Sequence, residues 1–186
     1  GSETQKSDLH HIYPCRGNVN SSRGNKPFAD INDNETDKWW RSDYYETSIP
    51  SQYINEFSEV DNDNGKFEPR EDVKGNIARS IFYFYTIYNN VADQSFFDIQ
   101  KETLYTWHKE DPANEKELER TYAIASYQNN IPNPFIIDST LIKRIWFLNC
   151  YENANSQLII EDIINNNFFD SNIDVNSDTK VDLFDL

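Results

Sequence analysis

The strongest structural signal in this sequence is a run of apolar residues at helical spacing that follows Glu68 and Pro69. Pro69 suits the first position of a helix, and the acidic Glu71 and Asp72 oppose the positive end of its dipole. The apolar residues recur every three or four positions and share one face, which we expect to be core: Val73, Ile77, Ile81, Phe84 and Tyr88. The chain is therefore expected to build its core around a helix.

Three more helical patterns follow. The second spans about residues 95–108, the third begins at Pro112 with Asp111 as its cap, and the fourth is capped by Asp138. Their expected core anchors are Phe97, Leu104 and Trp107, then Leu118, Tyr122 and Ala125, then Leu141, Ile142, Ile145 and Trp146. Residues 29–66 are aromatic, acidic and turn-rich, which predicts irregular structure with short strands. The predicted fold class is α+β, predominantly helical.

Aromatic rings are abundant, with 12 Phe, 11 Tyr and 4 Trp, whereas hydrophobic residues make up only 37% of the chain. We expect a core of a few large rings and a modest margin of stability. One aromatic group, Trp39, Trp40, Tyr44 and Tyr45 beside Arg41, could stack bases as single-strand binders do. Packing in the core or in a hairpin is the favoured interpretation.

The charge balance restricts the partners. With 32 acidic residues against 17 Lys and Arg, the formal net charge is -15, which excludes a general electrostatic attraction to nucleic acid or to an anionic membrane. A polyanion must therefore meet a local basic patch or a metal ion. No apolar run approaches the roughly 20 residues that span a bilayer, so no membrane partner is expected.

The length of 186 residues suits one domain, placed at residues 3–149, and an acidic C-terminal tail rich in Asn and Asp at residues 150–186. Cys15 and Cys150 are the only cysteines of the sequence. A single disulfide and two free thiols are both consistent with this pair.

A dense polar motif occupies residues 8–25, in which residues 8–14 predict a strand and the remainder predicts a loop and the start of a helix. Asn20 can offer a neutral carbonyl oxygen to a hard divalent cation, and Arg23 can clamp a phosphate through two parallel hydrogen bonds. His11 can act as a base near neutral pH. As a set, these residues suit metal-assisted phosphodiester hydrolysis.

A purely structural role is the alternative for each of these residues alone. His10 and His11 would then be strand residues satisfied by backbone carbonyl groups, and Asn18, Asn20 and Asn25 would shape turns. The density of the set at this spacing favours the site.

Four motifs stand in order along residues 8–146. They are Asp-Leu-His-His-Ile-Tyr-Pro with Val-Asn-x-x-Arg-x-Asn at residues 8–25, Phe-Glu-Pro with Val-Lys-Gly-Asn-Ile-Ala-Arg at residues 67–79, Trp-His-Lys-Glu-Asp-Pro at residues 107–112, and Asn-Pro-Phe at residues 133–135. In this order they resemble the bacterial endonuclease I family, secreted or periplasmic nucleases of the ββα-metal class. We therefore expect a secreted or periplasmic protein.

The resemblance implies a nonspecific endonuclease that acts on DNA, with RNA as a further candidate substrate, and that uses one Mg²⁺ or similar divalent cation. In such enzymes a histidine activates the attacking water, while the metal, held by an acidic residue and an asparagine, stabilises the phosphorane and the leaving oxygen. Asn20 matches the metal-ligand asparagine, and Arg23 falls in the segment that faces the scissile phosphate. The expected nucleic-acid-binding residues are Arg16, Arg23, Asn25, Lys74 and Arg79. For Lys74 and Arg79, a structural role is an equal alternative, in which they solvate the helix and form a packing salt bridge.

The family also carries a Glu-His-x-x-Pro segment that supplies the acidic metal ligand and the general base from the first strand of the ββα unit. No Glu-His pair exists in this chain, so we expect a ββα-metal nuclease-like domain with an incomplete N-terminal strand. Neither His10 nor His11 occupies the position of the family's general base. His11 is kept only as a candidate that could replace it. Activity of this chain is therefore left open, and a catalytically inactive nuclease-like binding or scaffold protein is the alternative.

Residues 174–185 place oxygen-bearing side chains at the ligand positions of a calcium loop and resemble a dockerin repeat. The candidate Ca²⁺ ligands are Asp174, Asn176, Asp178, Asp182 and Asp185. Thr179 replaces the glycine of the sharp turn, so a solvated acidic tail is favoured over docking on a cohesin-type scaffold protein. A second acidic run, from Asp61 to Gly65, predicts a hairpin turn.

Overall fold

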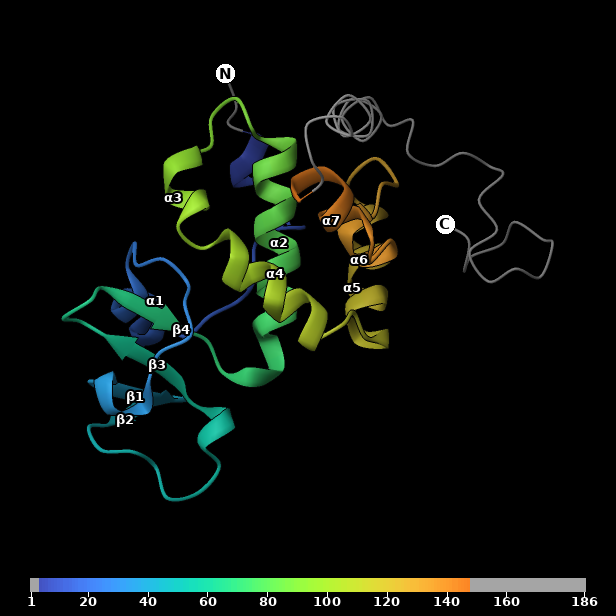
Figure 1. The fold of residues 1–186 in the computed structure, drawn as a ribbon. Coiled ribbons are helices and arrows are strands. Elements are labelled where there is room, and N and C mark those ends of the chain that lie inside the picture. Colours follow the sequence, from blue (N-terminus) through green and yellow to red (C-terminus); the bar gives the residue numbers. More distant parts are fainter. Residues whose placement is uncertain (1–3, 148–186) are drawn as a thin grey trace.

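The computed structural model describes residues 4–147. Figure 1 shows a small sheet with one helix beside it, and a group of helices around the long helix α2 (Lys74–Ile87). The other helices are α1 (Gly17–Arg23), α3 (Gln94–Asp98), α4 (Lys101–Glu110), α5 (Glu115–Ala125), α6 (Pro134–Ile137) and α7 (Leu141–Trp146). Short 3-10 turns are η1 (Thr4–Lys6), η2 (Asp33–Glu35), η3 (Ile54–Glu56) and η4 (Glu71–Val73). The predicted α+β, predominantly helical class is confirmed, and no helix of residues 4–147 is long and apolar enough to cross a bilayer.

The sheet is antiparallel throughout, with strand order β2-β1-β3-β4. Its strands are β1 (Lys38–Arg41), β2 (Tyr44–Glu46), β3 (Ser58–Asp61) and β4 (Lys66–Glu68). The predicted hairpin turn after Asp61 is confirmed: Asp61 Oδ1 accepts a 2.8 Å hydrogen bond from Asn64 N, and Gly65 adopts a φ of +65° that favours glycine. The short strands expected in this region are thus present.

Helix α2 begins later than the sequence indicates. Strand β4 and the turn η4 come first, so the helix starts at Lys74 and Pro69 is not its first residue. The predicted apolar face is only partly buried, whereas Ala78 and Phe82 on the neighbouring face are fully buried. The reason is that α2 lies between α4 and α6 and is enclosed on several sides (Figure 1), so no single stripe of the helix is the core.

The second predicted helix is in fact two helices, α3 and α4, which separate at Ile99 and Gln100. The buried Gln100 side chain accepts a hydrogen bond from Phe28 N at 3.1 Å and donates one to Phe96 O at 3.0 Å. It therefore ties this junction to the segment beside the sheet. The predicted anchors of this region are confirmed as buried: Phe97, Leu104 and Trp107.

Helix α5 is capped by Asn114, whose Oδ1 accepts a hydrogen bond from Glu117 N at 3.1 Å, and not by Asp111. The prediction of Leu118 as a core anchor was wrong, because the buried face of α5 carries the polar Glu117 and Thr121 instead. In α7, three of the four predicted anchors are buried, and Trp146 packs against them: Leu141, Ile142 and Ile145.

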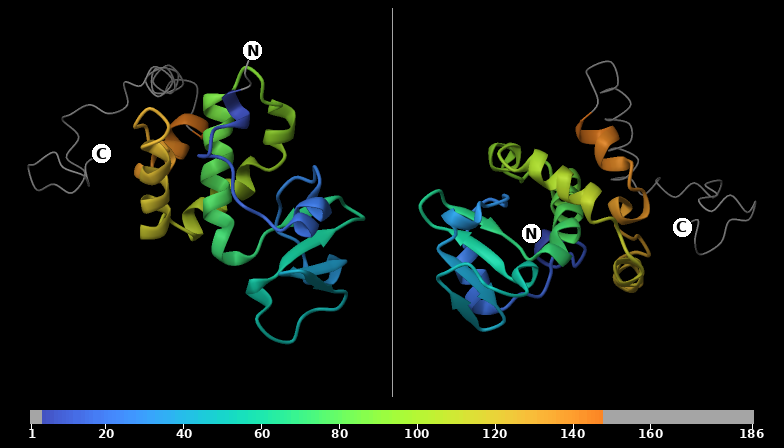
Figure 2. Two further views of the ribbon diagram at one scale, coloured as in Figure 1. Left: turned by 180° about the vertical axis from the view of Figure 1, so that it is seen from behind. Right: turned by 60° about the horizontal axis from the view of Figure 1, so that its bottom comes forward.

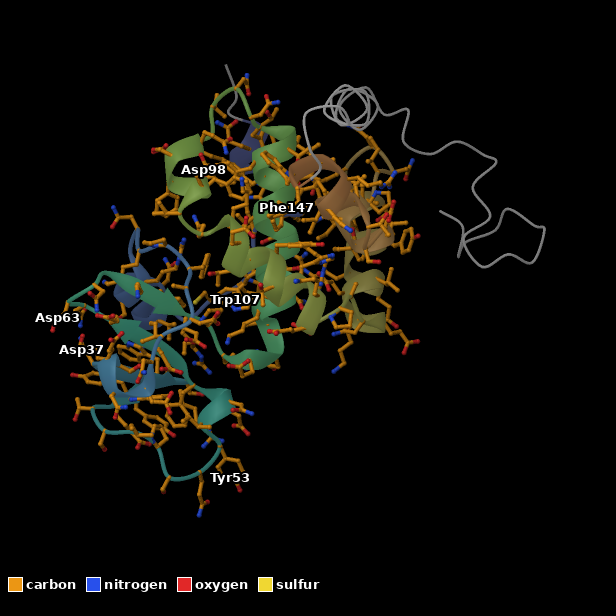
Figure 3. The ribbon with its side chains drawn as sticks, viewed as in Figure 1. Asp37, Tyr53, Asp63, Asp98, Trp107 and Phe147 are labelled. Atoms are coloured by element: carbon orange, nitrogen blue, oxygen red, sulfur yellow. The ribbon has the colours of Figure 1, made fainter. Side chains whose placement is uncertain are left out.

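Large rings fill the interior, as the composition predicts. Tyr85 and Phe97 stack with ring centroids 4.4 Å apart, and Phe82 meets Phe97 edge-on at 5.4 Å. Trp107 lies where the sheet meets the helices (Figure 3), and its Nε1 donates a 2.7 Å hydrogen bond to Asp30 Oδ1. This ring thereby joins the two parts of the molecule.

A fully buried ion pair connects three helices. Arg79 of α2 donates from Nε to the Glu117 carboxylate of α5 at 2.9 Å and 3.0 Å, and both side chains are 0% exposed. The second arm of the guanidinium donates to Asp111 O, at the end of α4, at 2.7 Å. At the same place, a Cβ added to Gly75 would lie 1.9 Å from Asp111 O, so α2 and α4 approach as closely as glycine allows.

Replacing Glu117 by Ala is expected to lower the free energy of unfolding by about 3–5 kcal/mol, because the Arg79 charge stays buried without its partner. Urea denaturation followed by circular dichroism measures this change. Asp43→Ala is the control, since it breaks an exposed Arg16–Asp43 pair of 3.0 Å and should cost less than about 1 kcal/mol. Equal losses for the two variants would contradict the central role of the buried pair.

Candidate nucleic-acid interface

Residues 8–14 do not form the strand that the sequence predicts. They are turns and irregular backbone that run along α2 toward α1 (Figure 2, left). Side chains of the α5 region hold this backbone: Arg120 donates to the carbonyl oxygens of Leu9 and Ile12 at 2.9 Å and 2.7 Å, and Gln128 accepts from Leu9 N at 3.0 Å. The strand prediction was wrong because α5 satisfies the polar groups that a neighbouring strand would otherwise satisfy.

Asp8 anchors this segment to α2. Its buried carboxylate accepts hydrogen bonds of 2.8 Å from the hydroxyl groups of both Tyr83 and Tyr88, and one of 2.9 Å from His10 N. Burial opposes ionisation of Asp8, but the hydrogen bonds from His10 N, Tyr88 and Tyr83 outweigh it and lower the pKa. The Asp8 carboxylate therefore serves to hold this segment against α2.

Both histidines of the motif bind backbone carbonyl groups. His10 Nε2 lies 2.8 Å from Ile131 O, and His11 Nε2 lies 2.8 Å from Gln5 O, so each Nε2 carries the proton that it donates. Burial lowers the pKa of His10, which keeps its ring neutral. The His11 ring packs against Phe84, with centroids 5.0 Å apart. These contacts match the carbonyl-bound alternative for both rings, and a base role for His11 would fall to Nδ1.

Helix α1 presents Asn20 and Arg23 three residues apart, on neighbouring positions of one face. The Asn20 side chain is exposed and forms no hydrogen bond with residues 4–147. The Arg23 guanidinium lies over the Phe28 ring, with Cζ 4.3 Å from the centroid, and its buried Nε has no hydrogen-bond partner in this part of the chain. Burial lowers the pKa of Arg23, although a guanidinium stays charged. Thus α1 carries a neutral amide and a partly desolvated cation whose hydrogen-bonding groups the described residues do not use.

Two other predicted residues flank α1. Arg16, which precedes the helix, forms an exposed ion pair with Asp43, and Asn18 Nδ2 donates to Asp43 O at 3.1 Å. Asn25 is exposed and follows Gly24, whose φ of +55° ends the helix. The structure therefore gathers Arg16, Asn20, Arg23 and Asn25 around one short helix.

The described residues do not by themselves form a site for a divalent cation. Within residues 4–147 there is no group of three or more His, Cys, Asp or Glu side chains that could hold a metal ion. Asn20 offers one neutral oxygen, whereas Mg²⁺ is bound in proteins through one or two carboxylates and several waters. The sole nearby acidic group of the motif, Asp8, already accepts hydrogen bonds from two tyrosines.

Lys74 lies in a cluster of carboxylates at the junction of β4 and α2. Its Nζ is 2.6 Å from Glu68 Oε1, 2.7 Å from Glu71 Oε1 and 3.4 Å from Asp30 Oδ1, and its side chain is buried. Glu59 stands opposite Glu68 across the strand pair. Burial and the charge of Glu68 raise the pKa of Glu59 to about 7, against the 2.6 Å hydrogen bond from Thr36.

Arg79 is fully buried in its pair with Glu117, so a direct contact with nucleic acid would require this pair to open. In the structure, both Lys74 and Arg79 form buried salt bridges, as in the packing role that was the alternative to nucleic-acid binding. His108 is buried as well: its Nε2 donates to Ser139 O at 2.8 Å, and burial lowers its pKa. His108 therefore belongs to the packed interior.

Sequence reasoning missed two cations near α1. Lys26 Nζ donates to Ser22 O at 3.1 Å, and Lys38 Nζ lies 5.0 Å from the centroid of the Tyr45 ring; neither lysine forms an ion pair with the described residues. The favoured packing interpretation of the aromatic group holds for Trp39 and Trp40, which are buried, and Tyr45 packs on Trp40 across the β1–β2 pair while remaining 45% exposed. For Lys38, the signal that could have identified it is its position directly after the acidic residues Asp33, Glu35 and Asp37.

Several predictions concern residues outside the described part of the chain. The calcium-loop residues at 174–185 and Cys150 belong to this group. Cys15 is exposed and forms no disulfide with the described residues.

Comparison with known proteins identifies the family of this chain. The Endonuclease I family matches residues 1–140, and the chain belongs to this family. An extracellular ribonuclease of Bacillus subtilis (strain 168) is 30% identical over 156 residues, which cover 75% of this chain and 46% of the relative. A periplasmic deoxyribonuclease of Aeromonas hydrophila is 30% identical over 133 residues, with 70% and 47% covered. The chain thus spans about half the length of these relatives.

Replacing Glu59 by Gln is expected to flatten the pH dependence of unfolding. Because the pKa of Glu59 is raised to about 7 in the folded protein, this group stabilises the fold fully below about pH 4.5, and that contribution is lost as the pH rises through 7. The wild-type free energy of unfolding should therefore fall by up to about 3 kcal/mol more than that of Glu59→Gln between pH 5 and 8. Urea titrations at these pH values measure it, with the exposed Glu56→Gln as control. Parallel pH profiles for Glu59→Gln and wild type would contradict the buried acid.

Proposed function

We propose that this chain acts in nonspecific endonucleolytic cleavage of phosphodiester bonds in DNA and RNA. One observation carries the proposal: α1 presents the Asn20 amide and the Arg23 guanidinium side by side, and neither forms a hydrogen bond with the described residues. Family membership and relatives named deoxyribonuclease and ribonuclease support the reaction and the substrate class. Relatives named extracellular or periplasmic support export from the cytoplasm.

The role proposed for Arg23 is to bind the scissile phosphate. A guanidinium holds two phosphate oxygens through parallel hydrogen bonds, and its charge counts for more where water is excluded. The Phe28 ring under Arg23 and the burial of Nε provide that environment. As negative charge builds up on the phosphorane, a preformed cation at this position lowers the barrier.

A divalent cation such as Mg²⁺ is part of the proposal, with Asn20 as one ligand. The described residues do not by themselves complete a site for this ion. Binding of nucleic acid without cleavage is the second candidate function. The absence of a metal-binding cluster in residues 4–147 and the carbonyl-bound Nε2 of His11 favour it.

The calcium tail remains a separate proposal. Ca²⁺ would bind through Asp174, Asn176, Asp178, Asp182 and Asp185 and permit docking to a scaffold protein. Isothermal calorimetry of the full chain with Ca²⁺ tests it, and no heat of binding would contradict it.

A plasmid-nicking assay of the full chain, with Mg²⁺ and with EDTA, tests the nuclease proposal. Mg²⁺-dependent nicking is expected, with a loss of about 100-fold or more for Arg23→Ala, because one preorganised donor to the phosphorane is removed. Asn20→Ala should lose Mg²⁺-dependent activity, and Arg70→Ala, which breaks an exposed pair with Asp72, should match the wild type.

The outcomes separate the two candidate functions. Binding of an oligonucleotide without nicking would establish the binding-only function, and neither binding nor nicking would contradict both. If His11→Ala nicks like the wild type, His11 is not the base.

A further inference from the structure

An exposed tyrosine stands on the edge strand of the sheet, on the side where α1 packs. Tyr45 of β2 pairs in register with Trp40 of β1, their ring centroids are 4.8 Å apart, and Tyr45 is 45% exposed. Trp40 is buried, and its Nε1 donates a 3.0 Å hydrogen bond to Ser22 Oγ of α1. Trp40 thus supports the Tyr45 ring from one side and leaves part of it open to solvent.

The same contacts lead from Tyr45 to Arg23. Ser22, which binds Trp40, directly precedes Arg23, and Ser22 O accepts the hydrogen bond from Lys26 Nζ. Helix α1 packs on the sheet through β3, on the side of the molecule away from α5 to α7 (Figure 2). Tyr45 and Arg23 therefore flank the face of the sheet on which α1 packs: Tyr45 stands on the edge strand β2, and Arg23 lies over Phe28, which bridges Phe67 of β4 at the other edge.

Three cations on this surface have no acidic partner. Arg23, Lys26 and Lys38 form no ion pair with any described residue, although the chain carries 32 acidic side chains against 17 basic ones. Elsewhere on the sheet, Arg41 is paired with Glu56. A polyanion is the partner that the charge of these three side chains fits.

We propose that Tyr45, with Lys38 beside it, is a base-stacking platform that extends the Arg23 phosphate site and selects single-stranded nucleic acid. The proposal rests on the proposed function. A base stacks on the exposed part of the Tyr45 ring while Lys38 holds the adjacent phosphate, and Lys26 and Arg23 hold phosphates further along the same strand. In a duplex both faces of each base are covered by their neighbours, so only an unpaired base can use the ring.

The test is fluorescence anisotropy with a labelled 12-nucleotide single strand and with the matching duplex, in EDTA so that neither is cleaved. Tyr45→Ala should weaken single-strand binding about fivefold to a hundredfold and change duplex binding little. Tyr45→Phe should bind like the wild type, because the ring is retained, and Tyr45→Leu should bind like Tyr45→Ala.

Tyr44→Ala is the matched control. Tyr44 lies on the same strand, is 49% exposed and points to the opposite face of the sheet, so its loss should leave binding unchanged. Circular dichroism of each variant checks that the sheet is intact, since Tyr45 packs on Trp40.

Failure of this inference differs from failure of the proposed function. If Arg23→Ala weakens binding but Tyr45→Ala does not, or if Tyr45→Leu equals the wild type, the stacking platform is wrong and the phosphate site stands. An equal loss on duplex and single strand would also overturn the selection of single strands. No binding by the wild type would contradict the proposed function itself.

Discussion

The buried pair between Arg79 and Glu117 is the constraint on which the rest of the structure depends. It fixes α5 against α2 and, through Asp111 O, fixes the end of α4 as well. The position of α5 in turn places Arg120, which binds the carbonyl oxygens of residues 9 and 12. A buried ion pair contributes little net stability, but it tolerates only one geometry, because an unpaired buried charge is costly. The pair therefore selects the arrangement of helices that holds the N-terminal segment.

The polar motif at residues 8–25 is divided between two tasks. In its first half, Asp8 and both histidine Nε2 atoms already have hydrogen-bond partners within the fold. In its second half, the side chains of Asn20 and Arg23 have none among the described residues. A polar group that is already satisfied gains little from a ligand, whereas a buried group without a partner, such as Arg23 Nε, regains the hydrogen bond that it lost on burial. The first half therefore anchors the segment, and the second half is where a ligand gains most.

Local patterns predicted what local interactions decide. Phe97, Leu104 and Trp107 were identified as anchors because helical periodicity reports burial. Leu118 was misassigned, since Glu117 holds the buried position through a partner 38 residues away in sequence. The strand expected at residues 8–14 failed for the same reason, because its hydrogen-bond partners lie more than 100 residues further along the chain. Such distant partners leave no trace in the local spacing of residues.

The candidate site shows the same boundary between local and distant effects. Asn20 and Arg23 could be placed together from sequence because they share one helix. The placement of Lys38 and Tyr45 on the sheet face beside α1 depends instead on the register of β1 and β2 and on the hydrogen bond from Trp40 to Ser22. This local surface also resolves the conflict with the net charge of -15. Charges more than about 8–10 Å apart are largely screened at physiological salt, so the distant carboxylates repel a phosphate weakly. Contacts at hydrogen-bonding distance then decide whether it binds.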